Sequence, residues 1–216
     1  MVFGVGGSVA GFVLAGGRSS RMGSDKALEL FGGRPLIQRA LSILAEVAAG
    51  PRIAGSRSTL AGYAEEIPDT FAEAGPLGGV HAGLSASVAE WNVFLPVDVP
   101  LMPASLLRCL VELAILTGSP VTVATLNGRM EPFPVVLNRS VLPQITDLLE
   151  RQDAACHAAW RSIPEVLGAE LDAVAVENLV QCGQCSHPLA LPPMLWFQSA
   201  NTQGELALLH RYAGFA

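Results

Sequence analysis

Short apolar runs and helix-like apolar spacing alternate along most of this chain. Runs of strand length occupy residues 9–14, 52–56, 91–97 and 120–126. Between the first two runs, apolar residues recur every three or four positions from Leu36 to Val47 and stop at Gly50-Pro51, as in an amphipathic helix. Strand, helix and strand in succession form a βαβ unit. The pattern predicts an α/β domain of three layers, Rossmann-like, with a mostly parallel central sheet.

The second half of the chain continues with a predicted helix and a hairpin. A helix is expected from Ala104 to about Leu116, and Asn127-Gly128 is a strong hairpin signal between the strand before it and a return run at 131–137. Pro132 and Pro134 interrupt that return run, which favours an edge position in the sheet. Further helices are predicted at 141–149 and 203–212, with a short strand at 174–176.

Composition and charge restrict the class of protein. The chain has 216 residues, half of them apolar, which suits one domain spanning 1–216, with 153–195 as a divergent segment that could be an insertion. A net charge of −6 without a basic cluster argues against sequence-independent nucleic-acid binding. Apolar runs are too short to span a bilayer, and the N-terminus lacks the positive start of a signal peptide. We therefore expect a cytoplasmic protein that binds neither membrane nor nucleic acid.

The stretch from Leu14 to Lys26 carries the strongest chemical signal. A glycine pair follows the first strand directly, so backbone N–H groups of residues 14–17 can face a ligand without obstruction. Arg18, Arg21 and Lys26 add positive charge within the same loop, which suits a triphosphate. The spacing fits neither a Walker loop nor a dinucleotide-binding fingerprint. The backbone contacts to base and phosphates are assigned to Leu14, Ala15, Gly16 and Gly17.

Asp98 ends the apolar run that begins at Trp91. A carboxylate at the end of a buried strand is unfavourable unless a cation accompanies it. Magnesium bound to phosphate oxygens is the natural partner, because it takes hard oxygen ligands. The alternative, a cap for the next helix, fits poorly because that helix begins several residues later.

Cysteine and histidine residues near the C-terminal third leave a second chemistry open. Cys182, Cys185 and His187 lie close together in sequence, and Cys156-His157 come earlier. These residues could hold zinc if the fold brought them together, but one Cys-x-x-Cys is a weak signal. A disordered or loosely packed loop is the favoured interpretation, and no thioredoxin-like pattern supports a redox role.

The stretch Leu-Ala-Gly-Gly-Arg-Ser-Ser-Arg-Met-Gly-Ser-Asp-Lys closely resembles the signature of nucleotidyltransferases with a glycosyltransferase-A-like fold. Within that superfamily the chain is most similar to the molybdenum cofactor guanylyltransferases. The resemblance implies transfer of GMP from GTP to molybdopterin with release of pyrophosphate, and Mg²⁺ as cofactor. It also implies GTP and molybdopterin as partners, with molybdoenzyme apoproteins or other cofactor-biosynthesis proteins as further candidates.

The resemblance also suggests roles for individual residues. Arg21, Lys26 and Asp98 would be catalytic, with Arg21 and Lys26 holding the triphosphate and Asp98 holding magnesium. Asp69 and the Gly-Pro-Leu turn, with Pro76, Leu77 and Gly78, would contact the nucleotide, together with Leu14, Ala15, Gly16, Gly17, Lys26 and Asp98. Asn201 is a candidate second metal ligand, although Asn201 or Thr202 could equally cap the terminal helix. Ser56 departs from the polar amide frequent in relatives.

Two other functions remain open at this stage. The same fold could use CTP with molybdopterin, or a sugar phosphate as acceptor, because the contacts that select the base are not fixed by the motifs. A nucleotide-binding regulator without catalytic activity would be the alternative of another class. The presence of Arg21, Lys26 and Asp98 favours an enzyme.

Overall fold

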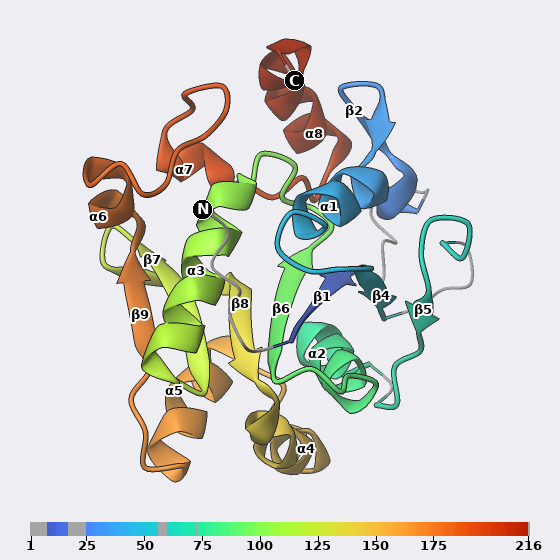
Figure 1. Cartoon of the computed structure of the whole chain (residues 1–216). Helices are drawn as coiled ribbons and strands as arrows, with labels where there is room; N and C mark the ends of the chain where they lie inside the picture. Colours follow the sequence, from blue (N-terminus) through green and yellow to red (C-terminus); the bar gives the residue numbers. More distant parts are fainter. Residues whose placement is uncertain (1–7, 17–24, 56–59, 72, 216) are drawn as a thin grey trace.

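The computed structural model describes residues 8–16, 25–55, 60–71 and 73–215 (Figure 1). Its centre is a seven-stranded sheet with the order β5-β4-β1-β6-β8-β7-β9. The strands are β1 (Val9–Leu14), β4 (Arg52–Ala54), β5 (Glu66–Ile67), β6 (Trp91–Pro96), β7 (Val121–Leu126), β8 (Arg129–Asn138) and β9 (Asp172–Ala175). A separate two-stranded hairpin pairs β2 (Leu30–Phe31) with β3 (Arg34–Pro35). Within the main sheet β8 is antiparallel to both neighbours and the other pairings are parallel, as the strand pattern predicts.

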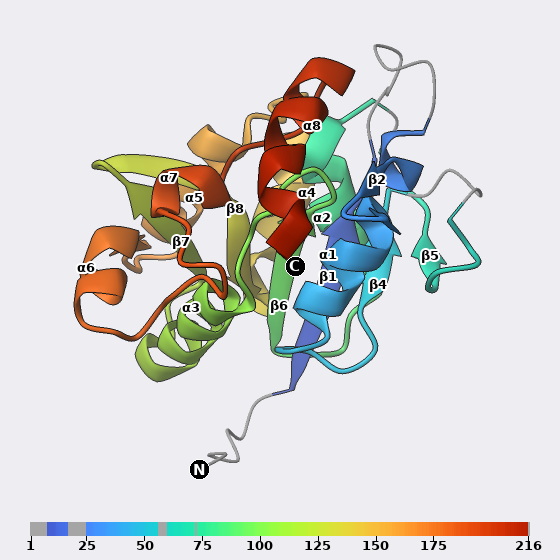
Figure 2. The same ribbon diagram turned by 90° about the horizontal axis from the view of Figure 1, so that it is seen from above.

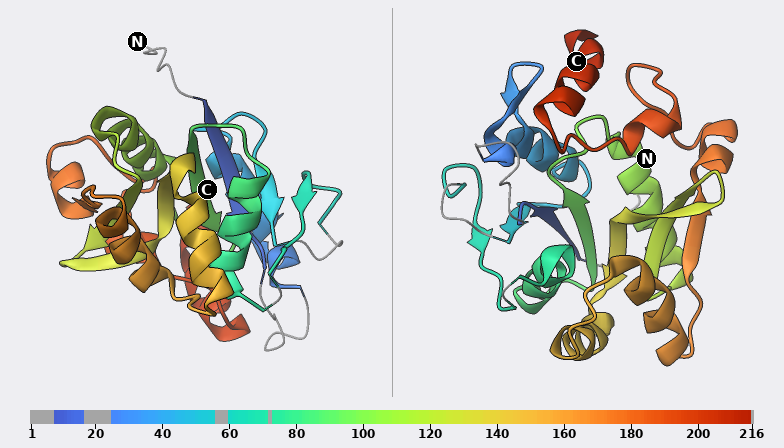
Figure 3. Two further views of the ribbon diagram at one scale, coloured as in Figure 1. Left: turned by 90° about the horizontal axis from the view of Figure 1, so that it is seen from below. Right: turned by 180° about the vertical axis from the view of Figure 1, so that it is seen from behind.

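Helices cover both faces of this sheet, giving three layers. Helices α1 (Leu36–Leu44) and α3 (Ala104–Thr117) pack on one face, and α2 (Gly75–Ser85), α4 (Leu142–Glu150) and α5 (Cys156–Val166) on the other (Figure 3). Shorter helices follow: α6 (Val176–Gln181), α7 (Pro193–Trp196), α8 (Gln203–Leu209) and the 3-10 turns η1 (Lys26–Leu28), η2 (Arg139–Val141) and η3 (His210–Phe215). Among the described helices, none combines the length and apolarity that a membrane crossing requires.

Two glycines on the side of helix α2 that faces the sheet, Gly79 and Gly83, allow the helix to pack closely against it. The rings of Phe12 and Phe94, on neighbouring strands, stack with centroids 5.1 Å apart. Gly83 sits against this pair, where an added Cβ would lie 2.7 Å from a Phe94 ring carbon. Gly79 packs in the same way against Leu14 at the end of β1. The close approach brings the first turn of α2 beside the carboxyl ends of the strands.

The expected edge position of the proline-containing strand is wrong. Strand β8 lies between β6 and β7, in the interior of the sheet. Its pairing with β6 begins only at Val135, and its pairing with β7 shifts register between Val123 and Ala124. Pro132 and Pro134 fall in this irregular stretch, so they cost the ladder no regular hydrogen bond.

The interpretation of the loop around Cys182 and Cys185 as disordered or loosely packed is also corrected. Residues 153–195 include α5, β9, α6 and α7, and β9 extends the main sheet by pairing with β7. Cys185 is 1% exposed. The predicted strand at 174–176 begins earlier, at Asp172, and Val176 already belongs to α6. The division of the chain into one domain with an inserted segment stays a prediction.

Gly83→Ala should destabilise the protein, because the added methyl group meets the stacked Phe12 and Phe94 rings. Overpacking of this kind costs about 1–3 kcal/mol, more than the helix propensity gained by alanine. Chemical denaturation would measure the change. Gly204→Ala in α8 is the matched control, since a Cβ there has no heavy atom nearer than 3.9 Å. Equal stability of the two variants would contradict the packing argument.

Candidate active site

The ends of β1 and β6 lie side by side and begin the site. The two strands pair in parallel up to Leu14 and Pro96, and the Val97 N–H donates to the Leu14 carbonyl at 3.1 Å. Asp98 follows directly. Because parallel strands end at one edge of a sheet, ligands of such folds bind there. Figure 2, a view from above, shows α8 lying over this region.

Three polar side chains from distant parts of the sequence meet at this edge. The Lys26 ammonium donates to Asp98 Oδ2 at 2.7 Å and to Asn201 Oδ1 at 2.8 Å. The side chains of Lys26 and Asp98 are only 14% and 22% exposed. The structure therefore brings together Lys26, Asp98 and Asn201, three residues that the sequence analysis selected separately.

The segment before α8 holds Asn201 rigidly. The Asn201 amide nitrogen donates to Ser199 Oγ at 2.7 Å, so its oxygen faces Lys26. The backbone N–H groups of Asn201 and Thr202 both donate to Glu205 Oε2, at 2.7 and 2.9 Å. Thr202, and not Asn201, is the N-cap, in a capping box with Glu205. Asn201 thus lies just outside the helix, with its side chain directed at the lysine.

The loop that carries Asp98 is anchored from several sides. Its Asp98 carbonyl accepts from the Ala200 N–H at 2.8 Å. The Arg39 guanidinium of α1 donates to the Pro100 carbonyl and lies over the Phe31 ring. Nearby, burial and the Arg39 charge lower the pKa of His187. These contacts fix the backbone on both sides of the carboxylate.

Asp69 lies beside Gly16, on the β4 side of the site. An added Cβ on Gly16 would be 3.6 Å from Asp69 Oδ2, and one on Gly55 would be 3.6 Å from Oδ1. The same atom on Gly55, whose φ is +89°, would approach the Gly16 Cα to 2.8 Å, so position 55 needs glycine. A Cβ on Gly16 would come within 3.3 Å of the Gly55 Cα, which is a tight contact. Although Asp69 as a residue is exposed, partial burial of its carboxylate raises its pKa.

The Gly-Pro-Leu turn opens α2 at the same edge. No side chain caps its first turn, and Pro76 is the second residue of the helix. Leu77 is fully buried in the core and Gly78 is buried too, so a ligand can meet only their backbone. Backbone N–H groups at a helix N-terminus bind anions or polar base atoms. His81, further along α2, is buried and packs edge-on against the Phe71 ring.

Several residues selected from the sequence lie outside the described part of the chain. They are Gly17, Arg18, Arg21 and Ser56. The roles assigned to Gly17 and Arg21 therefore stay predictions. Leu14 and Ala15 are described, and both are buried at the end of β1.

The cysteines follow a different arrangement from the one that zinc would need. Cys185 is buried against α3, where it meets Ser105 Oγ at 3.3 Å, and interaction with the Cys109 thiol lowers the pKa of Cys185 to about 7. His187 stacks on Trp196, and Cys182 is exposed. Across the described ranges, no three His, Cys, Asp or Glu side chains form a group that could hold a metal ion.

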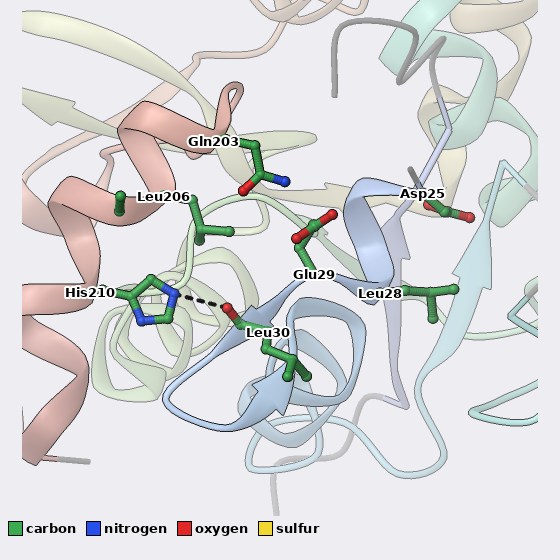
Figure 4. A pocket seen from close by; sticks show the side chains of 8 residues that line it. Asp25, Leu28, Glu29, Leu30, Gln203, Leu206 and His210 are labelled. Carbon is green, nitrogen blue, oxygen red and sulfur yellow. Dashed lines mark hydrogen bonds between the residues drawn. The ribbon is translucent and has the colours of Figure 1, made fainter. Parts of the chain in front are cut away.

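A pocket lies next to Lys26, Asp98 and Asn201, on the side of α8. It has a volume of about 570 Å³ and lies between α8 on one side and η1 with β2 on the other (Figure 4). Its lining comprises Asp25, Leu28, Glu29, Leu30, Gln203, Leu206, Ala207 and His210. His210 Nε2 lies 3.0 Å from the Leu30 carbonyl and ties the two walls together. Lys26 belongs to η1, and Asn201 lies just before α8. The pocket is therefore lined by the same two segments that carry Lys26 and Asn201, and it lies next to the site.

The oxygen atoms around Lys26 fit a magnesium ion by their chemistry. One carboxylate oxygen of Asp98 and one amide oxygen of Asn201 converge on a single cationic group. Mg²⁺ takes hard oxygen ligands and commonly uses one or two protein groups together with substrate phosphates and water. Asp98 and Asn201 are the residues that would hold it.

Comparison with known proteins gives the family. Residues 11–169 match the MobA-like NTP transferase domain. The chain belongs to this family. It is 32% identical to a molybdenum cofactor guanylyltransferase of Vibrio cholerae over 82% of this chain and 91% of the relative. The corresponding protein of Xanthomonas euvesicatoria is 34% identical, over 82% and 89%. Among solved structures, molybdopterin-guanine dinucleotide biosynthesis protein A from Archaeoglobus fulgidus superposes with a TM-score of 0.76 at 17% identity, covering 96% and 100%, which supports the fold.

In this MobA-like nucleotidyltransferase, three residues position the groups of the site although the sequence analysis did not select them. Ser199 orients the Asn201 amide, Glu205 holds its backbone, and Arg39 anchors the Asp98 loop. The Thr-x-x-Glu spacing of Thr202 and Glu205 is a capping-box signal that could have separated the cap from Asn201. No local pattern marks Ser199 or Arg39, because their partners are distant or depend on the turn.

Glu205→Ala should lower the free energy of unfolding by about 1 kcal/mol, the usual cost of a lost helix cap. Glu205→Gln should retain most of the stability, because glutamine can complete the same capping box. Thermal and urea unfolding would measure both. Glu46→Ala serves as control, since its exposed ion pair with Arg108 at 3.4 Å contributes little. A Glu205→Ala protein as stable as this control would contradict the role of the cap.

Proposed function

We propose that this protein transfers GMP from GTP to molybdopterin and releases pyrophosphate. The observation that carries the proposal is the convergence of Lys26, Asp98 and Asn201 where β1 and β6 end. Membership of the MobA-like family and the names of the curated relatives support this reaction and these substrates. In this reaction, a phosphate oxygen of molybdopterin, the acceptor, attacks the α-phosphorus of GTP.

Two anions meet in this reaction, so the site must chiefly neutralise charge. The attacking phosphate oxygen is already ionised at neutral pH and needs no general base. Lys26, released from Asp98, would bind triphosphate oxygens and stabilise the charge that develops on the leaving pyrophosphate. Asp98 and Asn201 would hold Mg²⁺, which when bound supplies further charge neutralisation on the phosphates. Arg21 is proposed to share the phosphate contacts with Lys26.

The base would lie on the side of Asp69. Its carboxylate faces Gly16 and Gly55, where the absence of Cβ atoms leaves the backbone accessible. A carboxylate can accept from N1–H and the 2-amino group of guanine together, whereas cytosine offers no such pair of adjacent donors. The backbone of Leu14, Ala15 and Gly16, with the first turn of α2 at Pro76, Leu77 and Gly78, would complete the nucleotide contacts.

The direct test is a transfer assay with purified protein, molybdopterin, Mg²⁺ and labelled GTP, CTP, ATP or UTP. GTP should give the dinucleotide product and pyrophosphate. Asp98→Asn and Lys26→Gln should each reduce turnover by at least about 100-fold, because each removes one charge from the phosphate site. Arg108→Gln, a surface change, should leave turnover near that of the wild type. Product formation from CTP in place of GTP, or none from any nucleotide, would refute the proposal.

Asp69→Asn should weaken GTP binding about 10- to 100-fold, since a hydrogen-bonded charged acceptor contributes roughly 1.5–3 kcal/mol. The asparagine should bind XTP better than the wild type does, because its amide can donate to the 2-oxo group of xanthine. Isothermal titration calorimetry with both nucleotides measures the exchange of preference. A variant that keeps the wild-type preference for GTP would exclude Asp69 from base recognition.

The pH dependence of GTP affinity gives a second test of Asp69. Only the ionised carboxylate accepts from both guanine donors, and burial raises the pKa of this group. Wild-type affinity should therefore be full at neutral pH and should fall on acidification earlier than an ordinary aspartate would require. The same titration on Asp69→Asn subtracts the protonation of GTP itself. Identical pH profiles for the two proteins would contradict the prediction.

A further inference from the structure

Lys26 stands where a metal ion would stand. We propose that Lys26 fills the cation position between Asp98 and Asn201 while no nucleotide is bound, and that it must leave this position before a divalent cation can bind there. The inference rests on the proposed function, because it concerns the metal that accompanies the nucleotide. It assigns Lys26 a second task besides phosphate binding: it keeps the metal position closed until the triphosphate arrives.

The distances support a shared position. The ammonium nitrogen lies 2.7 Å from Asp98 Oδ2 and 2.8 Å from Asn201 Oδ1, which are direct hydrogen bonds to both oxygens. Mg²⁺ bound to the same oxygens would need about 2.0–2.1 Å to each, so the ion and the ammonium group cannot occupy this space together. Their positive charges would also repel each other strongly at such a separation.

The surroundings keep the two oxygens in place without Lys26. Ser199 accepts from the Asn201 amide nitrogen at 2.7 Å and so fixes the direction of the amide oxygen. The Asp98 carbonyl accepts from the Ala200 N–H at 2.8 Å, which ties the two ligand-bearing segments to each other. Departure of the lysine would therefore leave an arranged pair of oxygen ligands instead of a collapsed loop.

The nucleotide supplies the alternative partner for Lys26. A lysine ammonium on its four-carbon stem can move by bond rotations, and the triphosphate offers more negative charge than the single Asp98 carboxylate. Moving Lys26 to a phosphate oxygen frees Asp98 and Asn201 for the cation, with no net loss of charge pairing. Metal and nucleotide would then each strengthen the binding of the other, by the same factor, as linkage requires.

Metal binding without nucleotide tests the inference directly. Mn²⁺, which favours similar oxygen sites and is visible by electron paramagnetic resonance, would be titrated into the wild type and Lys26→Met. Removal of a positive charge at direct contact should tighten Mn²⁺ binding by at least about tenfold. Arg34→Met is the matched control, because it removes the same charge from an exposed position on β3. It should bind Mn²⁺ as the wild type does.

Two further variants make the result specific. Adding Asp98→Asn to Lys26→Met should abolish the gain, because the carboxylate ligand is lost. Lys26→Gln serves as a second replacement if Lys26→Met proves poorly folded by circular dichroism. Mn²⁺ affinity of the lysine variants equal to that of the wild type would overturn the inference, as would an equal gain in Arg34→Met.

The outcome is separable from that of the transfer assay. A wild type that transfers no GMP while Lys26→Met gains Mn²⁺ affinity would refute the proposed reaction and leave the inference standing. A wild type that transfers GMP while its Lys26 variants show no gain would do the reverse. In the wild type, a GTP analogue with a methylene group between the α- and β-phosphorus atoms should tighten Mn²⁺ binding. Lack of that coupling would also count against the inference.

Discussion

The ion pair between Lys26 and Asp98 is the contact on which the arrangement of the site depends. It joins the segment after β1 to the end of β6 across 72 positions of sequence, and the lysine also reaches Asn201 across 175. The two side chains are partly shielded from water, which makes their attraction stronger than that of a surface pair. Removing the two charges from water also costs free energy, so a shielded ion pair adds little net stability and is more readily explained by a function of its two groups. In the proposed function, phosphate binding by Lys26 and metal binding by Asp98 would be that function.

The sheet determines why these residues meet. Strands β1 and β6 are adjacent and parallel, so the loops that follow them leave the sheet at one edge. Helix α2 approaches the same two strands closely because Gly83 faces Phe12 and Phe94 and Gly79 faces Leu14. The first turn of α2 and the Asp69 carboxylate then border the site on the opposite side from α8. Packing of the core and placement of polar groups are therefore consequences of the same strand order.

The sequence predicts the parallel part of this architecture well. The apolar run ending in Asp98 and the glycine pair after β1 both signal strand ends, and strand ends of a parallel sheet must share an edge. The interior position of β8 could not be predicted in this way. Proline occurs both in edge strands and at irregular positions of interior strands, so Pro132 and Pro134 do not distinguish the two cases. The residues around the two prolines give no sign of the register shift between β7 and β8 that accommodates them.

Longer-range positioning was less accessible from the sequence. Ser199 and Arg39 act through a turn and a distant carbonyl, and neither leaves a periodic signal. The sequence leaves Asn201 open between a metal ligand and a helix cap. The structure assigns the cap to Thr202, and the ligand role of Asn201 stays a prediction. The packing of the loop around Cys185 could not be predicted, because it comes from contacts with α3 that sequence spacing does not reveal. The same holds for the pairing of β9 with β7.

The wide separation of the three cluster residues has a consequence for how the chain is made. During synthesis on the ribosome, the segments bearing Lys26 and Asp98 emerge long before the one bearing Asn201. Contacts that span most of a chain form late, since the ends must first be brought together. A growing polypeptide can therefore pair β1 with β6 early, yet the three polar groups come together only when α8 has been released and has docked.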